Sequence, residues 1–332
     1  MRVLFWGTPE FGLPSLEAMR RAGHDIAGVV TNPDRPAGRG RRPRTSPVKA
    51  WALEAGVPVL QPERPGEEAF LAAARRLRPD ISVVAAYGRL LPQVALDLPP
   101  LGSLNVHASL LPALRGAAPI NWAIIRGHRE SGISIQRMVA ELDAGPVLGQ
   151  TRIPIPAAMT AGELYAEAAG AGGARLVAVL GDLASGRAVE RAQDDARATW
   201  APKLDRETAR IDWSRPAAEV ANWLRGCDPW PAAWTSLAAP AALAGRTVQC
   251  FEPSVDGPRA GDDPPAGGGG ADSARSEAAP GTVVRADPVR GLRVATGSGT
   301  VAVGAVKPAG RRRMSAAAWL RGLPDPKEVR FD

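Results

Sequence analysis

The sequence predicts an α/β fold, in which a Rossmann-like, mostly parallel sheet is followed by a smaller domain built of short strands. Strand-like and helix-like blocks alternate through the first half of the chain, which favours a parallel sheet covered by helices on both faces. After about Trp230, short strand-like pieces separated by turn residues replace the helices, which indicates a small barrel. The length of 332 residues is enough for two domains with separate cores.

Apolar runs and helical spacing place the elements of the first half. Strands are expected over residues 3–6, 25–31, 57–60, 81–86, 103–106 and 133–138, and helices over 14–22, 47–55, 67–77, 119–126 and 163–183. In folds of this kind, ligands bind beyond the carboxyl ends of the strands. Tyr87-Gly88 and Asn105–His107 fall at such ends, so these two segments are candidates for a site.

The second half begins with a connector and a short helix over 217–225. Short strands are expected over 233–237, 247–251, 281–285, 291–295 and 300–306. Residues 256–279 are rich in Gly, Pro, Asp and Ser and carry too little apolar surface to order themselves, so we expect a flexible insertion between two strands. The predicted organisation is therefore a domain over 1–200, a linker over 201–216 and a domain over 217–332.

Composition narrows the class of protein. The net charge of +7 fits either a polyanionic partner or a generally basic protein, and the total charge does not separate the two. Cys227 and Cys250 lack metal-ligand spacing and are expected to be buried, reduced thiols of a cytoplasmic protein. The N-terminus reads as a first strand, and no run of about 18 apolar residues occurs, so no membrane span is expected.

The turn Gly7-Thr8-Pro9-Glu10-Phe11-Gly12 lies where a dinucleotide-binding loop would lie. It lacks the middle glycine of that fingerprint, and Pro9 and Glu10 occupy the place where the backbone would approach a pyrophosphate. A tight turn between a strand and a helix is the favoured interpretation, and a nicotinamide-dependent dehydrogenase is a weak one.

Asn105, His107 and Asp143 supply an amide, an imidazole and a carboxylate. Asn105 and His107 are two apart on an extended segment, so their side chains should project to the same side. An amide can donate to the oxygen of a tetrahedral intermediate, and an imidazole can act as acid or base or add its own donor to that oxygen. A carboxylate can orient the imidazole. From spacing alone, satisfied polar residues at a strand end remain an equally open interpretation.

Four blocks in order around this trio carry a family resemblance. They are Asn105-Val106-His107-Ala108-Ser109-Leu110-Leu111-Pro112, Arg115-Gly116-Ala117-Ala118-Pro119-Ile120-Asn121-Trp122, Gly132-Ile133-Ser134-Ile135 and Leu142-Asp143-Ala144-Gly145. The chain resembles the formyltransferases that use 10-formyltetrahydrofolate. The resemblance implies a Rossmann-like domain without nicotinamide, no metal, and catalytic roles for Asn105, His107 and Asp143. It implies folate contacts from Tyr87, Gly88, Leu91, Ser109, Leu110, Leu111 and Pro112.

A basic loop and the second domain narrow the resemblance to one sub-family. Residues 33–49 carry five arginines and one lysine against the single acid Asp34, on a loop that should face the site. A solvated face is the alternative to phosphate contact. The loop resembles the one that methionyl-tRNA formyltransferases insert into the acceptor arm of the tRNA. Residues in register with that sub-family continue through the second domain, for which it implies an OB-like barrel. The tRNA contacts implied are Arg35, Arg39, Arg41, Arg42, Arg44, Lys49, Arg311, Arg312 and Arg313.

The activity that the resemblance implies is transfer of the formyl group of 10-formyltetrahydrofolate to the α-amino group of methionine on initiator tRNA, for initiation of translation, by a monomer. Two rivals stay open. A formyltransferase acting on a nucleotide-linked amino sugar or a purine precursor would share the core blocks but has no need of the basic loop. A tRNA-binding module with an inactive enzyme domain would share all the motifs.

Overall fold

A computed structural model describes residues 1–37, 42–255, 278–287, 289 and 291–332, and the backbone alone at 36, 37 and 42–44. The chain divides into two compact units. The first contains residues 1–120, 129–155 and 163–203, and the second contains 121–128, 156–162 and 204–332. The predicted insertion at 256–279 lies, except for its last two residues, outside the described residues.

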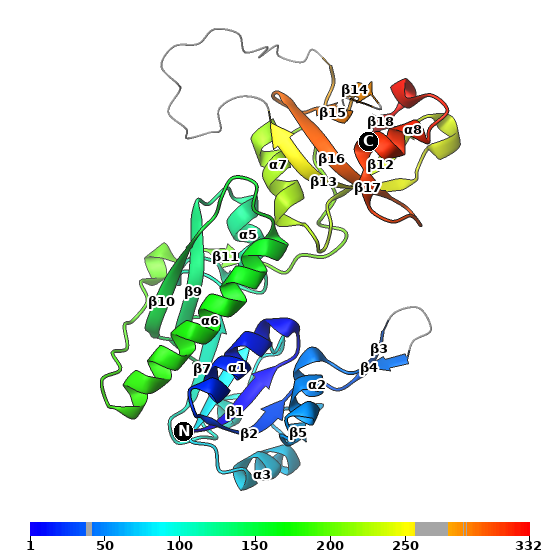
Figure 1. Ribbon diagram of the computed structural model, residues 1–332. Coiled ribbons are helices and arrows are strands. Elements are labelled where there is room, and N and C mark those ends of the chain that lie inside the picture. The colour runs from blue at the N-terminus through cyan, green and yellow to red at the C-terminus, as the bar shows by residue number, and fades with distance from the viewer. Residues whose placement is uncertain (38–41, 256–277, 288, 290) are drawn as a thin grey trace. The chain divides into compact units, whose positions relative to one another are not determined.

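The first unit is built on a seven-stranded sheet in the order β10-β9-β7-β6-β1-β2-β5 (Figure 1). The strands are β1 Arg2–Gly7, β2 Asp25–Val30, β5 Val59–Leu60, β6 Ile81–Ala85, β7 Ser103–His107, β9 Glu130–Arg137 and β10 Val147–Pro154. The five strands from β5 to β7 pair in parallel, whereas β9 and β10 add antiparallel edges. The predicted mostly parallel, Rossmann-like sheet is confirmed.

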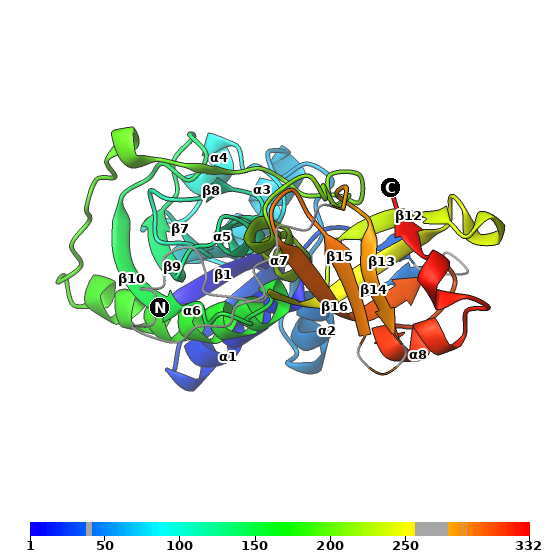
Figure 2. The same cartoon turned by 90° about the horizontal axis from the view of Figure 1, so that it is seen from above.

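Helices cover both faces of this sheet, as Figure 2 shows from above. The helices of the first unit are α1 Leu13–Arg21, α2 Pro47–Glu54, α3 Glu68–Arg76, α4 Gln93–Leu96 and α6 Ala161–Ala184, while α5 Pro119–Ile125 runs on into the second unit. On one face, Leu4 and Trp6 of β1 pack with Phe70 and Leu71 of α3. On the other, Gly173 of α6 approaches Pro14 of α1 so closely that a Cβ would lie 2.7 Å from the Pro14 carbonyl oxygen.

Strand β10 and the hairpin in the basic loop were not predicted. β10 is an edge strand whose side chains are mostly half-buried, so its sequence lacks the regular alternation of a strand with one buried face. In the basic loop, β3 Arg35–Ala37 pairs antiparallel with β4 Arg42–Arg44, so the predicted loop contains a short hairpin. The loop ends where the Ser46 hydroxyl caps α2 by accepting from the Lys49 N–H.

The second unit is a curved antiparallel sheet in the order β14-β15-β16-β13-β12-β18, with β17 beside β16. The strands are β12 Trp234–Ala239, β13 Thr247–Val255, β14 Val283–Asp287, β15 Gly291–Ala295, β16 Thr300–Pro308, β17 Met314–Ser315 and β18 Arg330–Phe331. A bridge between Thr282 and Arg330 joins the two ends of this order, which nearly closes the sheet. Helices α7 Ala217–Gly226 and α8 Ala316–Arg321 pack on it. The prediction of a smaller, OB-like barrel is confirmed.

Candidate functional site

The candidate site lies on the polar face of β7 and β9. In their antiparallel register Asn105 lies opposite Gln136 and His107 opposite Ser134, so these four side chains share one face of the sheet. His107, Ser134 and Gln136 are buried, and Asn105 is half-buried. The opposite face is apolar, because Val106 and Ile133 lie against Gly172 of α6. The predicted common direction of Asn105 and His107 therefore holds.

Asp143 joins this face from the loop between β9 and β10. Its Oδ1 lies 3.3 Å from the Asn105 amide nitrogen and 2.9 Å from that of Gln136. Its Oδ2 accepts from the Gly116 N–H at 2.9 Å. Its backbone φ of +53° is in the left-handed region, which a residue other than glycine adopts only under constraint. The structure thus brings the trio together around one carboxylate held by three donors.

The two ring nitrogens of His107 face different partners. Nε2 lies 3.0 Å from the Leu114 carbonyl oxygen, and because a carbonyl can only accept, Nε2 carries a proton and donates it. Nδ1 lies 3.6 Å from Asp143 Oδ1, with both side chains less than a tenth exposed. In the neutral imidazole, Nδ1 therefore holds the lone pair. A proton arriving there places a cation beside the carboxylate.

Two roles were open for the His107 imidazole, that of an acid or base and that of a donor to the oxygen of a tetrahedral intermediate. In the structure its Nε2 proton is directed to Leu114 and its Nδ1 faces a carboxylate. The Asn105 amide has a second hydrogen, for which the described part of the chain supplies no acceptor. On this geometry Asn105 has a hydrogen left to donate, and His107 Nδ1 has a lone pair that can accept a proton.

Two glycines in the four blocks that carry the family resemblance are required because a backbone carbonyl lies close to each of them. A Cβ on Gly145 would lie 1.9 Å from the Arg137 carbonyl oxygen, and one on Gly116 would lie 2.7 Å from that of Ala201. Gly116 also has a φ of +120°, which L side chains rarely adopt. The absence of side chains here allows the loops that carry the Gly116 N–H and Asp143 to fold tightly.

A glutamine network behind the trio was not predicted from the sequence. Gln136 donates to Asp143 Oδ1, while the Gln193 amide nitrogen lies 2.8 Å from the Asp143 carbonyl oxygen and 2.7 Å from that of Gly145. The alternation of Ser134 and Gln136 on a strand could have indicated that Gln136 belongs to the site. Nothing in the sequence places Gln193 near Asp143, because fifty residues separate them and tertiary folding alone joins them.

The segments expected to bind folate lie at the ends of β6 and β7. The ring of Tyr87 is buried and packs edge-to-face on Trp6, and its hydroxyl has no hydrogen-bond partner within the described residues. The Ser109 hydroxyl donates to the Ala113 carbonyl at 2.6 Å. Leu111 is buried as well, whereas Leu91, Leu110 and Pro112 are half-buried and Gly88 is exposed.

The residues expected to contact tRNA differ in their surroundings. Arg35, Arg311 and Arg312 are exposed, Arg39 and Arg41 lie outside the described residues, and Arg42 and Arg44 are placed on β4 by their backbone. Lys49 is directed inward, where its Nζ lies 2.6 Å from Asp34 and 2.7 Å from Gln61. That hydrogen bond from Lys49 is the main cause that lowers the pKa of Asp34.

Arg313 differs from its two neighbours in the triplet. Its guanidinium donates to both carboxylate oxygens of the buried Asp228, at 3.0 and 3.1 Å, and to Glu252 at 3.0 Å, and it covers the ring of Phe251. Asp228 would otherwise be a buried, uncompensated charge. The expectation of a phosphate contact therefore suits Arg311 and Arg312, whereas Arg313 is occupied within its own unit.

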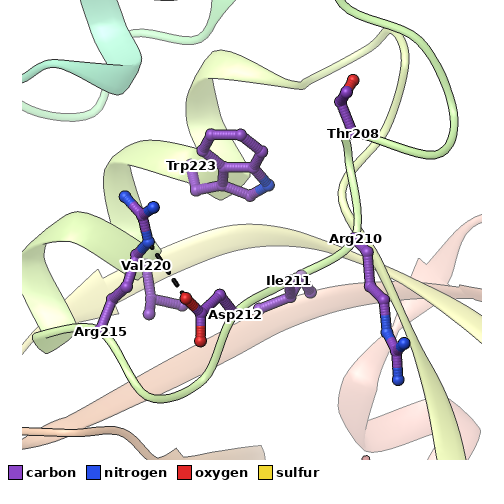
Figure 3. A pocket seen from close by; sticks show the side chains of 7 residues that line it. All are labelled: Thr208, Arg210, Ile211, Asp212, Arg215, Val220 and Trp223. Carbon is purple, nitrogen blue, oxygen red and sulfur yellow. Dashed lines mark hydrogen bonds and ion pairs between the residues drawn. The ribbon is translucent and has the colours of Figure 1, made fainter.

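A hollow of about 150 Å³ lies in the second unit (Figure 3). It is lined by Thr208, Arg210, Ile211, Asp212, Arg215, Val220 and Trp223. Its charges are paired locally, since Arg215 donates to Asp212 at 3.3 Å and lies over the Trp223 ring. A hydrogen bond from the Ser214 hydroxyl is the main cause that lowers the pKa of Asp212. These contacts stabilise the turn, and the hollow offers no group suited to acyl transfer.

Metal clusters and membrane-spanning helices are both absent from the described residues. Among them, no group of three or more His, Cys, Asp or Glu side chains could hold a metal ion. No helix in the same part of the chain is long and apolar enough to cross a membrane.

Both halves of the chain match known families. Residues 1–180 match the family described as Formyl transferase, and residues 203–324 match Formyl transferase, C-terminal domain. The methionyl-tRNA formyltransferase of Thiobacillus denitrificans is 45% identical over 325 residues, which cover 97% of this chain and 96% of that protein. That of Moorella thermoacetica is 41% identical, with 98% and 97% covered.

Solved structures at low identity share the fold. HypX from Aquifex aeolicus in complex with tetrahydrofolic acid has a TM-score of 0.59 at 18% identity, and the match covers 96% of this chain and 47% of that one. An N-formyltransferase from Helicobacter canadensis, solved with folinic acid and dTDP-3-aminofucose, has a TM-score of 0.59 at 12% identity, with 95% and 100% covered. At these identities the likeness shows the fold alone.

Proposed function

The chain belongs to the formyltransferase family, and from that premise we propose that it is the enzyme that formylates methionyl-tRNA. The formyl donor is 10-formyltetrahydrofolate, and the acceptor is the α-amino group of methionine on the initiator tRNA. The observation that carries the proposal is similarity over nearly the whole length, both domains included, to methionyl-tRNA formyltransferases. Because its product would be used in translation initiation, we propose that the enzyme acts in the cytoplasm, as a monomer.

The reaction needs only a proton relay and a donor to the developing oxyanion. The amine nitrogen attacks the formyl carbon, the bond from that carbon to N10 breaks, and the proton lost by the amine ends on N10. We assign the second Asn105 amide hydrogen to the oxyanion, a type of contact worth about 3–4 kcal/mol in comparable sites. His107 Nδ1 takes the proton from the amine and passes it on, while Asp143 stabilises the imidazolium between the two steps.

Folate would lie against the ends of β6 and β7. Leu90 is 77% exposed and follows Gly88, around whose Cα there is open space, so this segment offers an apolar surface and a close backbone approach. The role assigned here to Gly88, Leu91 and the segment 109–112 follows the family motif. A flat pteridine ring would suit such a surface because Leu90 offers apolar area to one of its faces.

The decisive experiment mixes the purified protein with 10-formyltetrahydrofolate and methionyl initiator tRNA. We expect formylmethionyl-tRNA and tetrahydrofolate in equal amounts. A protein that binds the tRNA but yields no formylated product would be the binding module with an inactive enzyme domain. A protein that formylates a nucleotide-linked amino sugar or a purine precursor and ignores the tRNA would be the small-substrate rival. Elongator methionyl-tRNA serves as the matched control for acceptor choice.

A further inference from the structure

The short segment of residues 193–201 lies behind the trio and reaches both residues that hold His107. These residues are Leu114, whose carbonyl accepts from His107 Nε2, and Asp143, which faces Nδ1. Both have left-handed backbones, with φ of +61° and +53°. Such conformations in residues other than glycine are strained and persist only where neighbouring groups enforce them. Segment 193–201 supplies an enforcing contact to each.

The first contact comes from Gln193. Its amide nitrogen donates to the Asp143 carbonyl at 2.8 Å, and its Oε1 accepts from the Arg115 guanidinium at 2.8 and 3.1 Å. The opposite orientation of the amide would set oxygen against carbonyl oxygens and nitrogen against a guanidinium, so the orientation is fixed. Arg115 is buried and paired with Asp195 at 2.6 Å. Gln193 thereby ties Asp143 to an anchored cation.

The second contact comes from Thr199. Its Oγ1 accepts from the Leu114 N–H at 2.9 Å, and its carbonyl accepts from the Arg115 N–H at 2.8 Å. Strand β11, Trp200–Ala201, then pairs in parallel with β8, Arg115–Gly116, whose glycine N–H donates to Asp143 Oδ2. Segment 193–201 thus holds the residues at both nitrogens of His107.

We propose that Gln193 and Thr199 are positioning residues that fix the direction of the His107 ring relative to Asp143. The inference rests on the proposed formyl transfer. Neither side chain touches the trio's side chains: Gln193 acts on the backbone of Asp143, and Thr199 acts on the backbone of Leu114. Displacement of a reacting group by about 1 Å can lower a rate about 10²-fold, so hydrogen bonds that prevent such displacement are worth far more to turnover than to folding.

The test uses two matched pairs of variants in the full-length enzyme. Gln193→Glu keeps an oxygen for Arg115 but turns a second oxygen toward the carbonyls of Asp143 and Gly145. Its control, Asp195→Asn, changes only the contact between Arg115 and residue 195. Thr199→Val removes the acceptor for Leu114, whereas Thr199→Ser retains it. Thr199 is exposed, so the valine opens no cavity in the core.

We expect Gln193→Glu and Thr199→Val to lower kcat by about 10-fold to 10²-fold with KM for tRNA and for folate nearly unchanged. Thr199→Ser and Asp195→Asn should stay within about 3-fold of the wild type. The acidic limb of the pH profile of kcat should shift in Thr199→Val, which adds no charge, because the Leu114 carbonyl moves relative to His107 Nε2. A merely structural role would not move it.

Three outcomes would overturn the inference: wild-type kcat in both Gln193→Glu and Thr199→Val, an equal loss in Thr199→Ser and Thr199→Val, or losses that vanish once rates are corrected for the folded fraction measured by circular dichroism. An inactive wild-type enzyme would instead remove the proposed formyl transfer. The two failures are therefore distinguishable.

Discussion

The site around Asp143 and the basic residues expected to contact tRNA are held in opposite ways. The carboxylate of Asp143 accepts three hydrogen bonds, and the residues that hold His107 are themselves fixed from behind. Among the basic residues, Arg35, Arg311 and Arg312 are exposed, whereas Lys49 and Arg313 are held by ion pairs. The residues around Asp143 are preorganised, two of them in left-handed backbone conformations, whereas the three exposed arginines lie at the surface.

This difference separates two kinds of function. A reacting group must keep one direction throughout the reaction, so it is surrounded by fixed dipoles before substrate binds. A phosphate contact needs only charge near a flexible backbone, so it tolerates mobile side chains and is weakened by salt. Changes near Asp143 should therefore act on kcat, and changes in the exposed cations should act on KM and its dependence on salt.

The largest effect is expected from Asp143→Asn. The amide of the new asparagine has two orientations. In one its NH2 group faces the Gln136 amide NH2, and in the other it faces the Gly116 N–H, so in both a donor meets a donor. The imidazolium also loses its counter-charge. We expect kcat to fall about 10³-fold with KM for tRNA within about 2-fold, measured by single-turnover formylation. A larger change in KM than in kcat would contradict the division between the two regions.

A smaller effect is expected from neutralisation of the basic loop. Replacement of Arg39, Arg41, Arg42 and Arg44 by alanine should raise KM for tRNA by about 10-fold or more and leave kcat at saturating tRNA unchanged. The slope of log KM against log salt should flatten by about 0.7 to 0.9 for each phosphate that the variant no longer neutralises. An unchanged slope would show that the loop does not meet phosphates and would favour a small substrate.

Arg313 provides a comparison inside one triplet. Arg313→Ala leaves Asp228 buried without its bidentate partner, so we expect a loss of about 2 kcal/mol in the free energy of unfolding, measured by urea denaturation. The double variant Arg311→Ala with Arg312→Ala should unfold like the wild type and bind tRNA less tightly. Equal stability of the two proteins would argue against the structural role of Arg313.

The smallest effect concerns the thiols. Burial raises the pKa of Cys227 and of Cys250 from 9.0 to about 12. Because the folded state disfavours the thiolate, the resulting stability is complete below pH 9 and is lost as the pH rises toward 12. At a pH about one unit below 9, neither thiol should react with a disulfide reagent in the folded protein, and both should react in guanidinium chloride. Rapid labelling without denaturant would contradict the burial.

Much of the fold could be predicted from local pattern. The strands of the parallel sheet are continuous apolar runs, and α3 shows its inward face in the spacing of Phe70, Leu71 and Ala74. The edge strand β10 could not be predicted, because its partly exposed residues carry no regular alternation. The two strands of the β3–β4 hairpin have three residues each and are too short for a period to show. The chemistry of Asn105, His107 and Asp143 could be proposed from residue type, but the tautomer of His107 could not, since it depends on the Leu114 carbonyl.

The sequence by itself determined the class of fold, the identity of the three polar groups and the concentration of positive charge near residues 33–49. Only the tertiary structure decided which nitrogen of His107 donates, that Arg313 is paired with Asp228, and that Gln193 and Thr199 lie behind the trio. The physical reason is the distance along the chain over which each effect acts. Propensity and periodicity act over a few residues, whereas a hydrogen bond is set by the position of a partner that can lie anywhere along the chain.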